Sequence, residues 1–547
     1  MNNAQNGVAR RDLLVATALA GAAVGSLLLF GTSQGDAPAH LYRTFLVQHG
    51  AVLWDNLWYA GQYPLTSYSL LYYFPAATVG NVTLVVGAVL ASALLFAAIA
   101  HQEWGAAARW PTRWFSVLAA APVFTGLYTY TLGLATLLAA LRVLQRGRAF
   151  VALLLAGITL GVSPLAFVFL CAILLAVFLS RRRIDRRTII VAAGLALIAC
   201  GEGIVLVLFP TPGTYPFSPI DLAAILTICA LGAYLATRSD RSGVLAAFFV
   251  VWGLGSVATF LVPTAVGDNW TRPRAFVFPL MLLTAAQARF RPRPLVVVAL
   301  VGALAYNLVP YLMQIPYRLD SRPASAGFWR PALAYLARHD GPDYRVEVVP
   351  TANHWEAYWL PRAGFALARG WYRQLDIEQN PVLYEKHLTT TAYRSWLRTM
   401  AIRYVLLPAT QLDPDGGPRE AAIVSGPRSG LRLVFRDTDW RIYALPHPTA
   451  ILTGKPGAHL DQLGHEAVTG TSTAAGAYAL RIRFTPYWTV TPAGTCVRPA
   501  PGGMTELVLA RPGRFTLRAP RSLDGFLDTL SRNGSSRCRP LLRTRAP

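Results

Sequence analysis

The sequence predicts a polytopic α-helical membrane protein that carries an extracytoplasmic C-terminal α/β plus β-sandwich domain. Only 14% of the 547 residues are charged, against roughly a quarter in soluble proteins. Between Leu13 and Leu312 the charges fall in short clusters that separate apolar stretches of roughly 20 residues, the length that crosses a bilayer. After Leu312 the long apolar runs end, and Pro, Gly, Asp and aromatic residues become frequent. These observations separate a membrane region, residues 1–312, from a globular region.

Eleven apolar segments are candidate membrane helices. Backbone amides in lipid must be satisfied within their own segment, so each crossing is expected to be helical. The segments cover residues 13–31, 82–100, 114–126, 129–144, 149–162, 165–180, 188–209, 220–236, 243–262, 275–289 and 295–312.

Arginine clusters predict the orientation of these helices. They occur in alternate loops, at Arg10, Arg11, Arg109, Arg113, Arg142, Arg146, Arg148, Arg181, Arg182, Arg183, Arg186, Arg187, Arg238, Arg241, Arg289, Arg291 and Arg293. The positive-inside rule places the N-terminus in the cytoplasm, and eleven crossings then place residues 313–547 outside. The preference for Arg over Lys indicates a GC-rich bacterial source, so the predicted location is a bacterial plasma membrane. The Arg10–Leu14 stretch resembles a twin-arginine export signal, but an uncleaved first helix is favoured because ten further helices make the signal redundant.

The net charge of +23 does not indicate nucleic-acid binding. The basic residues are mostly arginines that flank apolar segments, and no soluble module carries a basic patch interleaved with stacking aromatic residues. Of the five cysteines, Cys171, Cys200 and Cys229 lie in apolar segments. Cys496 and Cys538 lie in the C-terminal region without metal-ligand spacing, and a disulfide between them is expected if that region is extracytoplasmic.

The C-terminal region divides into an α/β part, residues 313–448, and a β-rich part, residues 449–547. Helices are expected at 325–340 and 381–401, and strands at 344–350, 402–408, 431–435 and 440–445. From residue 449 onward, short β segments alternate with Gly and Pro turns, which predicts a small β-sandwich.

The first external loop, residues 32–81, is too long for a simple connection and too rich in Trp and Tyr for a disordered one. Amphipathic stretches at 39–50 and 65–75 predict helices on the membrane surface. Asp36 follows the first helix at the bilayer edge, where an ionisable group is costly, and His40 would lie on the same helical face. The alternative is that Asp36 only caps the surface helix.

Further candidate binding residues lie in two external loops. In the first loop, Asp55 and Asn56 are surrounded by Trp54, Trp58 and Tyr59, and Tyr63 follows. The second loop, residues 266–276, presents Asp268, Asn269, Arg272 and Arg274 just before a helix. Guanidinium groups bind phosphate through two hydrogen bonds. Arginines that snorkel at a helix end are the alternative.

These features resemble a known superfamily. The first loop contains W-x-N-x-W-Y-A-G-x-Y-P-L followed by several tyrosines (residues 54–73), after a helix that ends in an external Asp. The chain resembles C-type (GT-C) membrane glycosyltransferases, and within them the bacterial membrane proteins labelled 6-pyruvoyl-tetrahydropterin-synthase-related. G-x-N-x-x-R (267–272), W-L-x-x-M-x-I-R-Y-V-L (396–406) and P-Y-W…G (486–494) fit this likeness.

The resemblance implies a sugar transferase that uses a polyprenyl-phosphate-linked sugar as donor and a glycan or glycolipid as acceptor, outside the membrane. It implies that Asp36 is the general base or orients the acceptor hydroxyl, with His40 one turn further on. Arg272 and Arg274, and less directly Arg43, are candidates to stabilise the departing phosphate. Asp55, Asp221 and Asp268 are candidates for a second carboxylate. No DxD-like pair marks a metal site, so participation of a divalent cation is left open.

Residues 353–376 of the external domain are dense in His, Trp, Tyr, Arg and Glu, and His354 and Glu356 are candidate acceptor contacts. A docking surface for the membrane helices is the alternative. Two other functions compete with transfer. A transporter or flippase for a lipid-linked precursor predicts charges within helices, for which Glu202 and the Gly161–Pro164 break are the hints. A non-catalytic scaffold for envelope assembly is the third interpretation.

Overall fold

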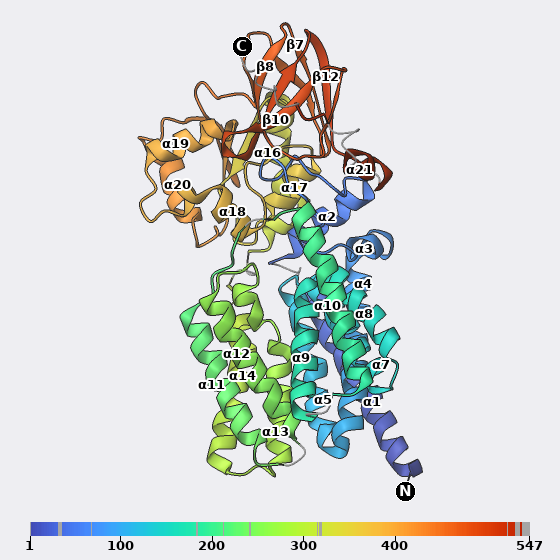
Figure 1. Cartoon of the computed structure of the whole chain (residues 1–547). Coiled ribbons are helices and arrows are strands. Elements are labelled where there is room, and N and C mark those ends of the chain that lie inside the picture. Colours follow the sequence, from blue (N-terminus) through green and yellow to red (C-terminus); the bar gives the residue numbers. More distant parts are fainter. Residues whose placement is uncertain are drawn as a thin grey trace. The chain divides into compact units, whose positions relative to one another are not determined.

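The computed structural model of the chain describes residues 2–30, 35–66, 68–181, 184–211, 213–239, 242–313, 315–316, 320–521, 523–530 and 536–538. Arg182, Arg183 and Arg241, which contribute to the predicted orientation, lie outside the described residues. The chain forms two compact units (Figure 1). The helical unit comprises residues 1–40 and 66–319, and the C-terminal unit comprises residues 41–65 and 320–547.

The helical unit is built from helices throughout its described residues. They are α1 (Asn2–Phe30), α3 (Tyr73–Val79), α4 (Asn81–Trp104), α5 (Arg109–Leu118), α6 (Ala121–Phe124), α7 (Tyr128–Gln145), α8 (Ala149–Val162), α9 (Pro164–Arg181), α10 (Arg186–Leu208), α11 (Pro219–Ala236), α12 (Gly243–Leu261), α13 (Arg274–Gln287) and α14 (Arg293–Leu312). Helix α2 (Ala37–Gln48) begins in this unit and ends in the other.

Each apolar segment identified in the sequence is helical. The segment at 114–126 is broken, because α5 ends at Leu118 and α6 occupies only Ala121–Phe124. Among the described residues, six helical stretches are long and apolar enough to cross a membrane: Arg11–Leu29, Asn81–Phe124, Pro164–Arg181, Arg186–Leu208, Pro219–Ala236 and Gly243–Leu261. Ala149–Val162 and Arg293–Val309 are shorter apolar helices. The count of eleven crossings therefore stays a prediction.

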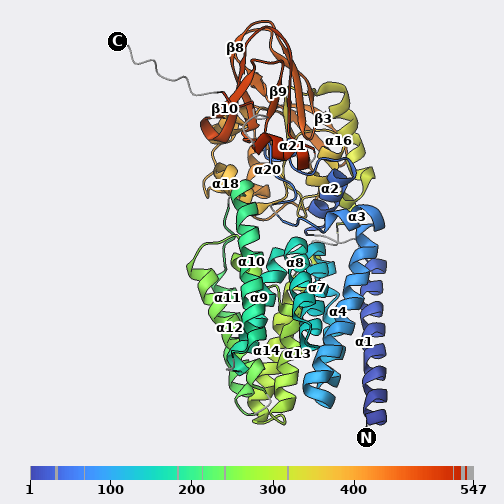
Figure 2. The same cartoon turned by 45° about the vertical axis from the view of Figure 1, so that its right-hand side comes forward.

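Helix α1 is an integral part of the helical unit. It packs against α5 and against α4, beside which it lies in Figure 2. Its buried Asp12 accepts a hydrogen bond from Nη2 of Arg113 at 3.3 Å, and Arg109 lies 3.7 Å away.

The α/β part of the C-terminal unit has one four-stranded sheet in the order β1-β2-β4-β3. Its strands are β1 (Arg345–Val348), β2 (Ile402–Pro408), β3 (Arg432–Arg436) and β4 (Trp440–Ala444). Strands β1 and β2 are parallel, and the remaining pairs are antiparallel. The accompanying helices are α16 (Ala326–His339), α17 (Glu356–Arg362), α18 (Arg373–Gln379), α19 (Thr390–Thr399) and α20 (Gly417–Ser425). The predicted helix at 381–401 is confirmed only over α19.

The β-rich part consists of two four-stranded sheets, β10-β11-β8-β5 and β6-β7-β12-β9 (Figure 1). The strands are β5 (Leu452–Thr453), β6 (His459–Leu463), β7 (Ala467–Ser472), β8 (Gly476–Arg483), β9 (Thr489–Thr491), β10 (Cys496–Ala500), β11 (Met504–Leu509) and β12 (Gly513–Arg518), followed by helix α21 (Leu523–Leu530). Both sheets contribute to one apolar core, which includes Leu480, Leu507, Val468 and Phe515. The two layers therefore form the expected sandwich.

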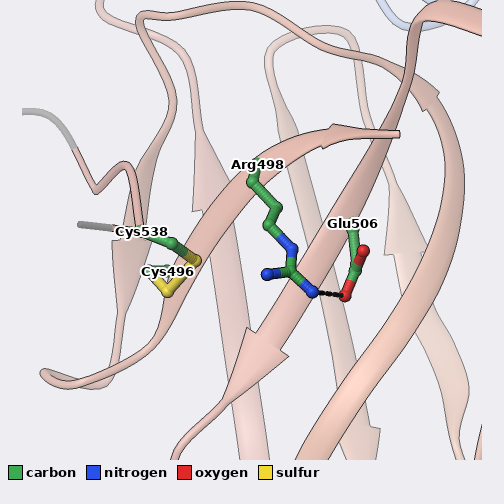
Figure 3. Close-up of a disulfide and its surroundings, with 4 residues drawn as sticks. All are labelled: Cys496, Arg498, Glu506 and Cys538. Carbon is green, nitrogen blue, oxygen red and sulfur yellow. Dashed lines mark hydrogen bonds and ion pairs between the residues drawn. A yellow bond between two sulfur atoms is a disulfide. The ribbon is translucent and has the colours of Figure 1, made fainter. Parts of the chain in front are cut away.

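Cys496 and Cys538 are joined by a disulfide (Figure 3). The bond holds the segment around Arg537 beside β10, where Val497 and Arg537 form an isolated parallel bridge. Arg498 and Glu506 form an exposed ion pair nearby, with 2.6 Å between Nη2 and Oε1. The pairing expected from the sequence is present in the structure.

Residues 41–65 belong to the C-terminal unit, which corrects the assignment of the whole 32–81 loop to the membrane region. Asp55 and Gln62 exchange two backbone hydrogen bonds of 3.0 Å and so form a small hairpin. Trp54 enters the sandwich core, while Ala60 enters the core of the α/β part. The predicted surface helix at 65–75 is also wrong over most of its length, because α3 begins only at Tyr73.

Candidate active site

Gly35 and Thr125 fix the backbone of Asp36. Gly35 has a φ of 67°, and a Cβ atom there would lie 2.5 Å from the carbonyl oxygen of Thr125. The next residue, Asp36, donates its backbone N–H to that same oxygen at 3.1 Å. Only glycine allows this close approach in this conformation. Asp36 directly precedes α2. This is the N-cap position, as the alternative role of Asp36 requires.

The carboxylate of Asp36 makes a tertiary contact with two side chains from distant loops. The hydroxyl of Tyr68 donates to Oδ2 of Asp36 at 2.8 Å. Nη2 of Arg272 lies 3.7 Å from the same oxygen, and Nη1 of Arg272 lies 3.4 Å from the Tyr68 hydroxyl. Asp36 is only 8% exposed. We call Asp36, Tyr68 and Arg272 the Asp36 site.

The charges within the Asp36 site favour one protonation pattern. Burial lowers the pKa of Arg272, but Tyr68 and Asp36 outweigh burial and raise that pKa overall, so the guanidinium stays charged. Burial and the negative charge of Asp36 raise the pKa of Tyr68, so the phenol keeps the proton that it donates. The site thus presents a carboxylate, a fixed cation and a hydrogen-bond donor.

The loop that carries Tyr68 is anchored to the end of α8. The hydroxyl of Ser69 and the backbone N–H of Leu71 both donate to the carbonyl of Gly161, at 3.2 and 2.8 Å. Further along, the hydroxyl of Tyr72 donates to Oδ1 of Asn81 at 2.9 Å. These bonds place Tyr68 against Asp36 although 32 residues separate them in the chain.

His40 lies one turn after Asp36 in an aromatic environment. It is 1% exposed, and its Nδ1 lies 3.0 Å from the hydroxyl of Tyr73. The rings of Tyr68 and Tyr128 lie 5.2 and 5.4 Å from the imidazole, measured between centroids. His40 therefore contacts the ring of Tyr68, whose hydroxyl donates to Asp36.

The second predicted loop contributes two arginines to different clusters. Arg272 joins the Asp36 site, whereas Nη2 of Arg274 lies 3.8 Å from Oδ1 of Asp221 at the start of α11. The carbonyl of Arg274 is bonded to Nδ2 of Asn307 in α14, which fixes the start of α13. Asp221 is thus paired with Arg274.

Asp268 and Asn269 belong to the short turn before Arg272. Burial and the charge of Asp221 raise the pKa of Asp268 to about 6, although Arg274 and Arg272 oppose this. Within the described residues, Oδ1 of Asp268 has no hydrogen-bond partner. Asn269 shapes the turn through its backbone, whose carbonyl accepts from the N–H of Arg272 at 3.1 Å.

Several predicted binding residues are instead structural parts of the C-terminal unit. Asp55 is fully buried and accepts from the hydroxyl of Tyr42 at 3.1 Å, with Nδ1 of His465 at 3.0 Å. Asn56 donates to the carbonyl of Gly464 at 2.9 Å. Their polar groups are engaged inside the unit, and neither side chain is accessible to a substrate. The predicted substrate-binding roles of these two residues stay predictions, and their burial does not support them.

The aromatic residues of the same segment and Arg43 also pack internally. The indole N–H of Trp58 donates to the carbonyl of Ala357 at 2.9 Å, and the hydroxyl of Tyr59 donates to the carbonyl of Tyr372 at 2.8 Å. The half-buried Tyr63 pairs with Thr485 at 2.9 Å. Arg43 is fully buried, and its guanidinium lies 4.4 Å from the Tyr372 ring and 5.6 Å from the Trp58 ring. The predicted roles in substrate binding (Trp58, Tyr59 and Tyr63) and in phosphate binding (Arg43) therefore stay predictions, which these internal contacts do not support.

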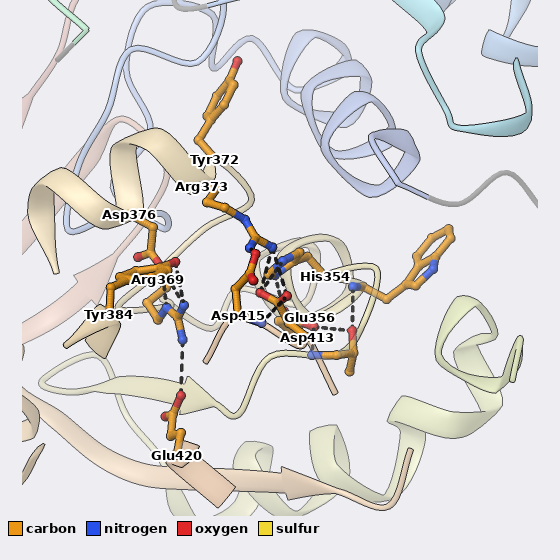
Figure 4. A network of polar contacts seen from close by, with 12 residues as sticks. His354, Glu356, Arg369, Tyr372, Arg373, Asp376, Tyr384, Asp413, Asp415 and Glu420 are labelled. Carbon is orange, nitrogen blue, oxygen red and sulfur yellow. Dashed lines mark hydrogen bonds and ion pairs between the residues drawn. The ribbon is translucent and has the colours of Figure 1, made fainter. Parts of the chain in front are cut away.

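His354 and Glu356 belong to a polar network in the α/β part (Figure 4). Nδ1 of His354 lies 3.0 Å from Oε1 of Glu356, and its Nε2 lies 3.3 Å from Oδ2 of Asp413. Arg373 also binds Asp413, at 2.9 Å. Burial lowers the pKa of His354, but the hydrogen bonds to Asp413 and Glu356 outweigh burial and raise that pKa to about 9. His354 is therefore an imidazolium clamped by two carboxylates.

The clamp predicts a pH-dependent stability of the C-terminal unit. Because the folded pKa of His354 lies above its unfolded value, its contribution is complete below about pH 6.5 and is lost as the pH rises through 9. The shift corresponds to at most about 3 kcal/mol. His354→Asn, which suits the φ of 53°, should lower the melting temperature at pH 7 and change it little at pH 10. His459→Asn is the control, because His459 is exposed and pairs with Asp461. An equal deficit for His354→Asn at both pH values would contradict the clamp.

Three further side chains contact Asp36 or His40, and the sequence does not single them out as site residues: Tyr68, Tyr73 and Tyr128. The run of tyrosines after Tyr63 is visible in the sequence, but spacing does not say which of them faces Asp36. Within the described part of the chain, no group of three or more His, Cys, Asp or Glu side chains is arranged to hold a metal ion.

Comparison of the chain with protein-family profiles and with curated protein sequences finds no match.

Proposed function

We propose that the chain is a membrane glycosyltransferase that acts on the extracytoplasmic side of a bacterial plasma membrane in the assembly of a cell-envelope glycan or glycolipid. The donor is a sugar linked to polyprenyl phosphate, and the acceptor is a glycan or glycolipid hydroxyl. The observation that carries the proposal is the Asp36 site, where a nearly buried carboxylate lies 3.7 Å from a guanidinium. A proton acceptor beside a phosphate-binding cation suits the transfer of a sugar from a phosphate to an alcohol.

In the proposed reaction, the acceptor oxygen attacks the anomeric carbon of the donor sugar. The bond between that carbon and the phosphate oxygen breaks, and its electron pair leaves with the polyprenyl phosphate. The acceptor proton passes to the carboxylate of Asp36. Arg272 stabilises the charge that develops on the phosphate, and Tyr68 holds the carboxylate in position through its hydrogen bond.

The loose geometry between Arg272 and Asp36 supports this division of roles. A bidentate Arg–carboxylate pair has two short hydrogen bonds, whereas these two groups approach only to 3.7 Å. A donor phosphate, which carries more negative charge, competes for the guanidinium. Arg272 then turns to the phosphate while Tyr68 still holds the carboxylate of Asp36.

The proposal includes the membrane topology. Eleven crossings with a cytoplasmic N-terminus place the C-terminal unit outside, and the Cys496–Cys538 disulfide fits an oxidising compartment. Alkaline phosphatase fused after residue 547 should be active, whereas the same enzyme fused after Arg238 should be inactive. The opposite pattern would exclude an extracytoplasmic C-terminal unit.

Gly35→Ala should reduce transfer through its effect on Asp36. The new Cβ would meet the Thr125 carbonyl at 2.5 Å, so the backbone that positions Asp36 must move. A displacement of about 1 Å costs roughly a hundredfold in rate. Gly80→Ala is the matched control, because Gly80 has a φ of 85° but nothing within 4 Å of its Cβ position. Transfer rates per folded protein should fall only for Gly35→Ala, and equal rates for both variants would contradict the close-approach argument.

Reconstitution into proteoliposomes separates transfer from transport. A transferase consumes the donor lipid and releases polyprenyl phosphate only when the acceptor is present on the side of the C-terminal unit. A flippase moves the intact donor between leaflets without consuming it. A scaffold does neither. Movement of intact donor without consumption would replace the proposed function by transport.

A further inference from the structure

A second polar site lies in the α/β part of the C-terminal unit, where Arg369 binds several acidic residues (Figure 4). Nε of Arg369 donates to Oδ2 of Asp376 at 2.7 Å, and Nη1 donates to Oε2 of Glu420 at 3.3 Å. Asp376 also accepts from the hydroxyl of Tyr384 at 2.6 Å, and Glu420 accepts from the hydroxyl of Tyr393 at 2.6 Å. Each of these two carboxylates therefore accepts a hydrogen bond from a tyrosine in addition to the one from Arg369.

The third carboxylate beside Arg369 is different. Glu347, on β1, is 1% exposed, and neither of its oxygens has a hydrogen-bond partner among the described residues. Its closest cation is Nη1 of Arg369, at 3.6 Å from Oε1. Native structures rarely bury a carboxyl group without hydrogen bonds, because the lost hydration is costly. We therefore expect a molecule from outside the chain to form hydrogen bonds with the carboxyl group of Glu347.

Glu347 borders a small cavity. The cavity is lined by Glu347, Val348, Pro350, His354, Glu356, Leu367, Arg369 and Gly370, and its free space suits a group of about the size of one water molecule. Glu356 is hydrogen-bonded to Thr351 at 2.6 Å and to His354. Of these lining side chains, all of them described, Glu347 alone has polar atoms without a hydrogen-bond partner.

The walls of the cavity select the chemistry of its occupant. Carboxyl groups and two cationic groups, His354 and Arg369, face the same small space. An anion would meet the carboxyls, and an ammonium group would meet the cations, so a neutral group is favoured. The described residues arrange no set of ligands for a metal ion. A hydroxyl group is neutral, has the right size, and both donates and accepts hydrogen bonds.

We propose that this cavity is an acceptor-recognition site, in which Glu347 hydrogen-bonds one hydroxyl group of an uncharged sugar residue. The inference rests on the proposed transferase function and names the substrate class that the C-terminal unit recognises: a neutral glycan acceptor. Leu367, Val348 and Pro350, all buried, supply the apolar part of the lining around the hydroxyl group. Asp36 and Glu347 thus have separate tasks, transfer and recognition.

Direct binding measurements on the full-length protein in nanodiscs without glycolipid test this inference. The probes are the methyl glycosides of glucose, galactose, mannose and arabinose, with glucuronate as the charged comparison, followed by saturation-transfer NMR and equilibrium dialysis. The wild type should bind at least one neutral glycoside. Glu347→Met, which preserves length but has no hydrogen-bonding group, should weaken binding at least tenfold. Glu506→Met is the matched control, because Glu506 is half-buried on β11, away from the cavity lining, and pairs with Arg498.

Melting temperatures guard against a folding artefact. Glu347 makes no hydrogen bonds that the substitution would remove, and Arg369 keeps Asp376 and Glu420, so Glu347→Met should melt close to the wild type. Glu347→Gln keeps hydrogen-bonding atoms and should weaken binding less than Glu347→Met. If no neutral glycoside binds the wild type, the cavity holds water only and the inference is wrong. Equal binding by the wild type and Glu347→Met would also overturn it.

Asp36→Asn distinguishes a failure of this inference from a failure of the proposed function. That variant should lose transfer and keep glycoside binding unchanged. Glu347-dependent binding by a wild type that never consumes donor lipid would refute the transferase function and keep the sugar site. Donor consumption without Glu347-dependent binding would refute the sugar site alone.

Discussion

Asp36→Asn is expected to lower the rate of sugar transfer by roughly 10²- to 10⁴-fold, the usual contribution of a general base. The substitution replaces the proton-accepting carboxylate by an amide that cannot take a proton from the acceptor hydroxyl. Its shape is preserved, and the amide oxygen still accepts the hydrogen bond from Tyr68. Transfer should therefore fall while the yield and melting temperature of the purified protein stay close to those of the wild type.

This substitution also separates catalysis from helix capping. Asn caps a helix about as well as Asp does, so a residue that only caps α2 would tolerate the change. Asp185→Asn is the matched control, because Asp185 precedes α10 and its carboxylate accepts from the backbone N–H of Thr188 at 2.7 Å. Wild-type rates in both variants would leave Asp36 with the capping role alone.

Arg369→Met is expected to destabilise the C-terminal unit by about 3–5 kcal/mol, the cost of leaving buried charge without its partner. Arg369 is 8% exposed and faces Asp376, Glu420 and Glu347, which are 3%, 2% and 1% exposed. For a unit of this size the loss corresponds to a fall of roughly 10 °C or more in melting temperature. The replacement keeps most of the side-chain volume, so the effect measures charge rather than packing.

Two comparisons test this explanation. Arg498→Met removes an exposed arginine whose pair with Glu506 contributes at most about 1 kcal/mol. Burial and neighbouring acids raise the pKa of Glu420 to about 7, although Arg369 and Tyr393 oppose this. A raised folded pKa costs stability as the pH rises from the unfolded value through 7, so the Arg369→Met defect should shrink at pH 5. Equal losses for Arg369→Met and Arg498→Met, or a defect independent of pH, would contradict the buried-charge account.

The helical and sheet elements were largely predictable because their signals are local. An apolar run between arginine clusters determines a helix such as α9 or α12 wherever it packs, and alternation marked the strands of the sandwich. The break between α5 and α6 was not predicted, because the sequence from 114 to 126 is apolar on both sides of it.

The environment of residues 41–65 was not predictable from composition. Tryptophan and tyrosine are enriched both at membrane surfaces and in the interior of domains that hydrogen-bond their polar ends. The indole N–H of Trp58 finds its acceptor, the Ala357 carbonyl, 299 residues away in the chain. Nothing near Trp58 in the sequence indicates that partner, so the segment resembled an interfacial loop.

The candidate site was partly predictable for the same reason. Asp36 and Arg272 stand out because charged residues at helix ends are costly and few, and the structure brings them together. Tyr68 does not stand out among the tyrosines around it. Its position depends on the anchoring of Ser69 and Leu71 to Gly161, a contact across 92 residues for Ser69. Glu347 lies within the strand predicted at 344–350. The alternation of apolar and polar residues predicts that strand, but it does not show whether the carboxyl group of Glu347 finds hydrogen-bond partners.

The central claim is that Asp36 takes the acceptor proton during sugar transfer outside the membrane. It is tested most directly by comparing the envelope glycans and polyprenyl-linked lipids of a deletion strain with those of the same strain complemented by the wild type or by Asp36→Asn. The deletion should accumulate the donor lipid and lack one sugar residue on an envelope glycan, the wild type should restore that residue, and Asp36→Asn should not. Full restoration by Asp36→Asn would contradict the assignment.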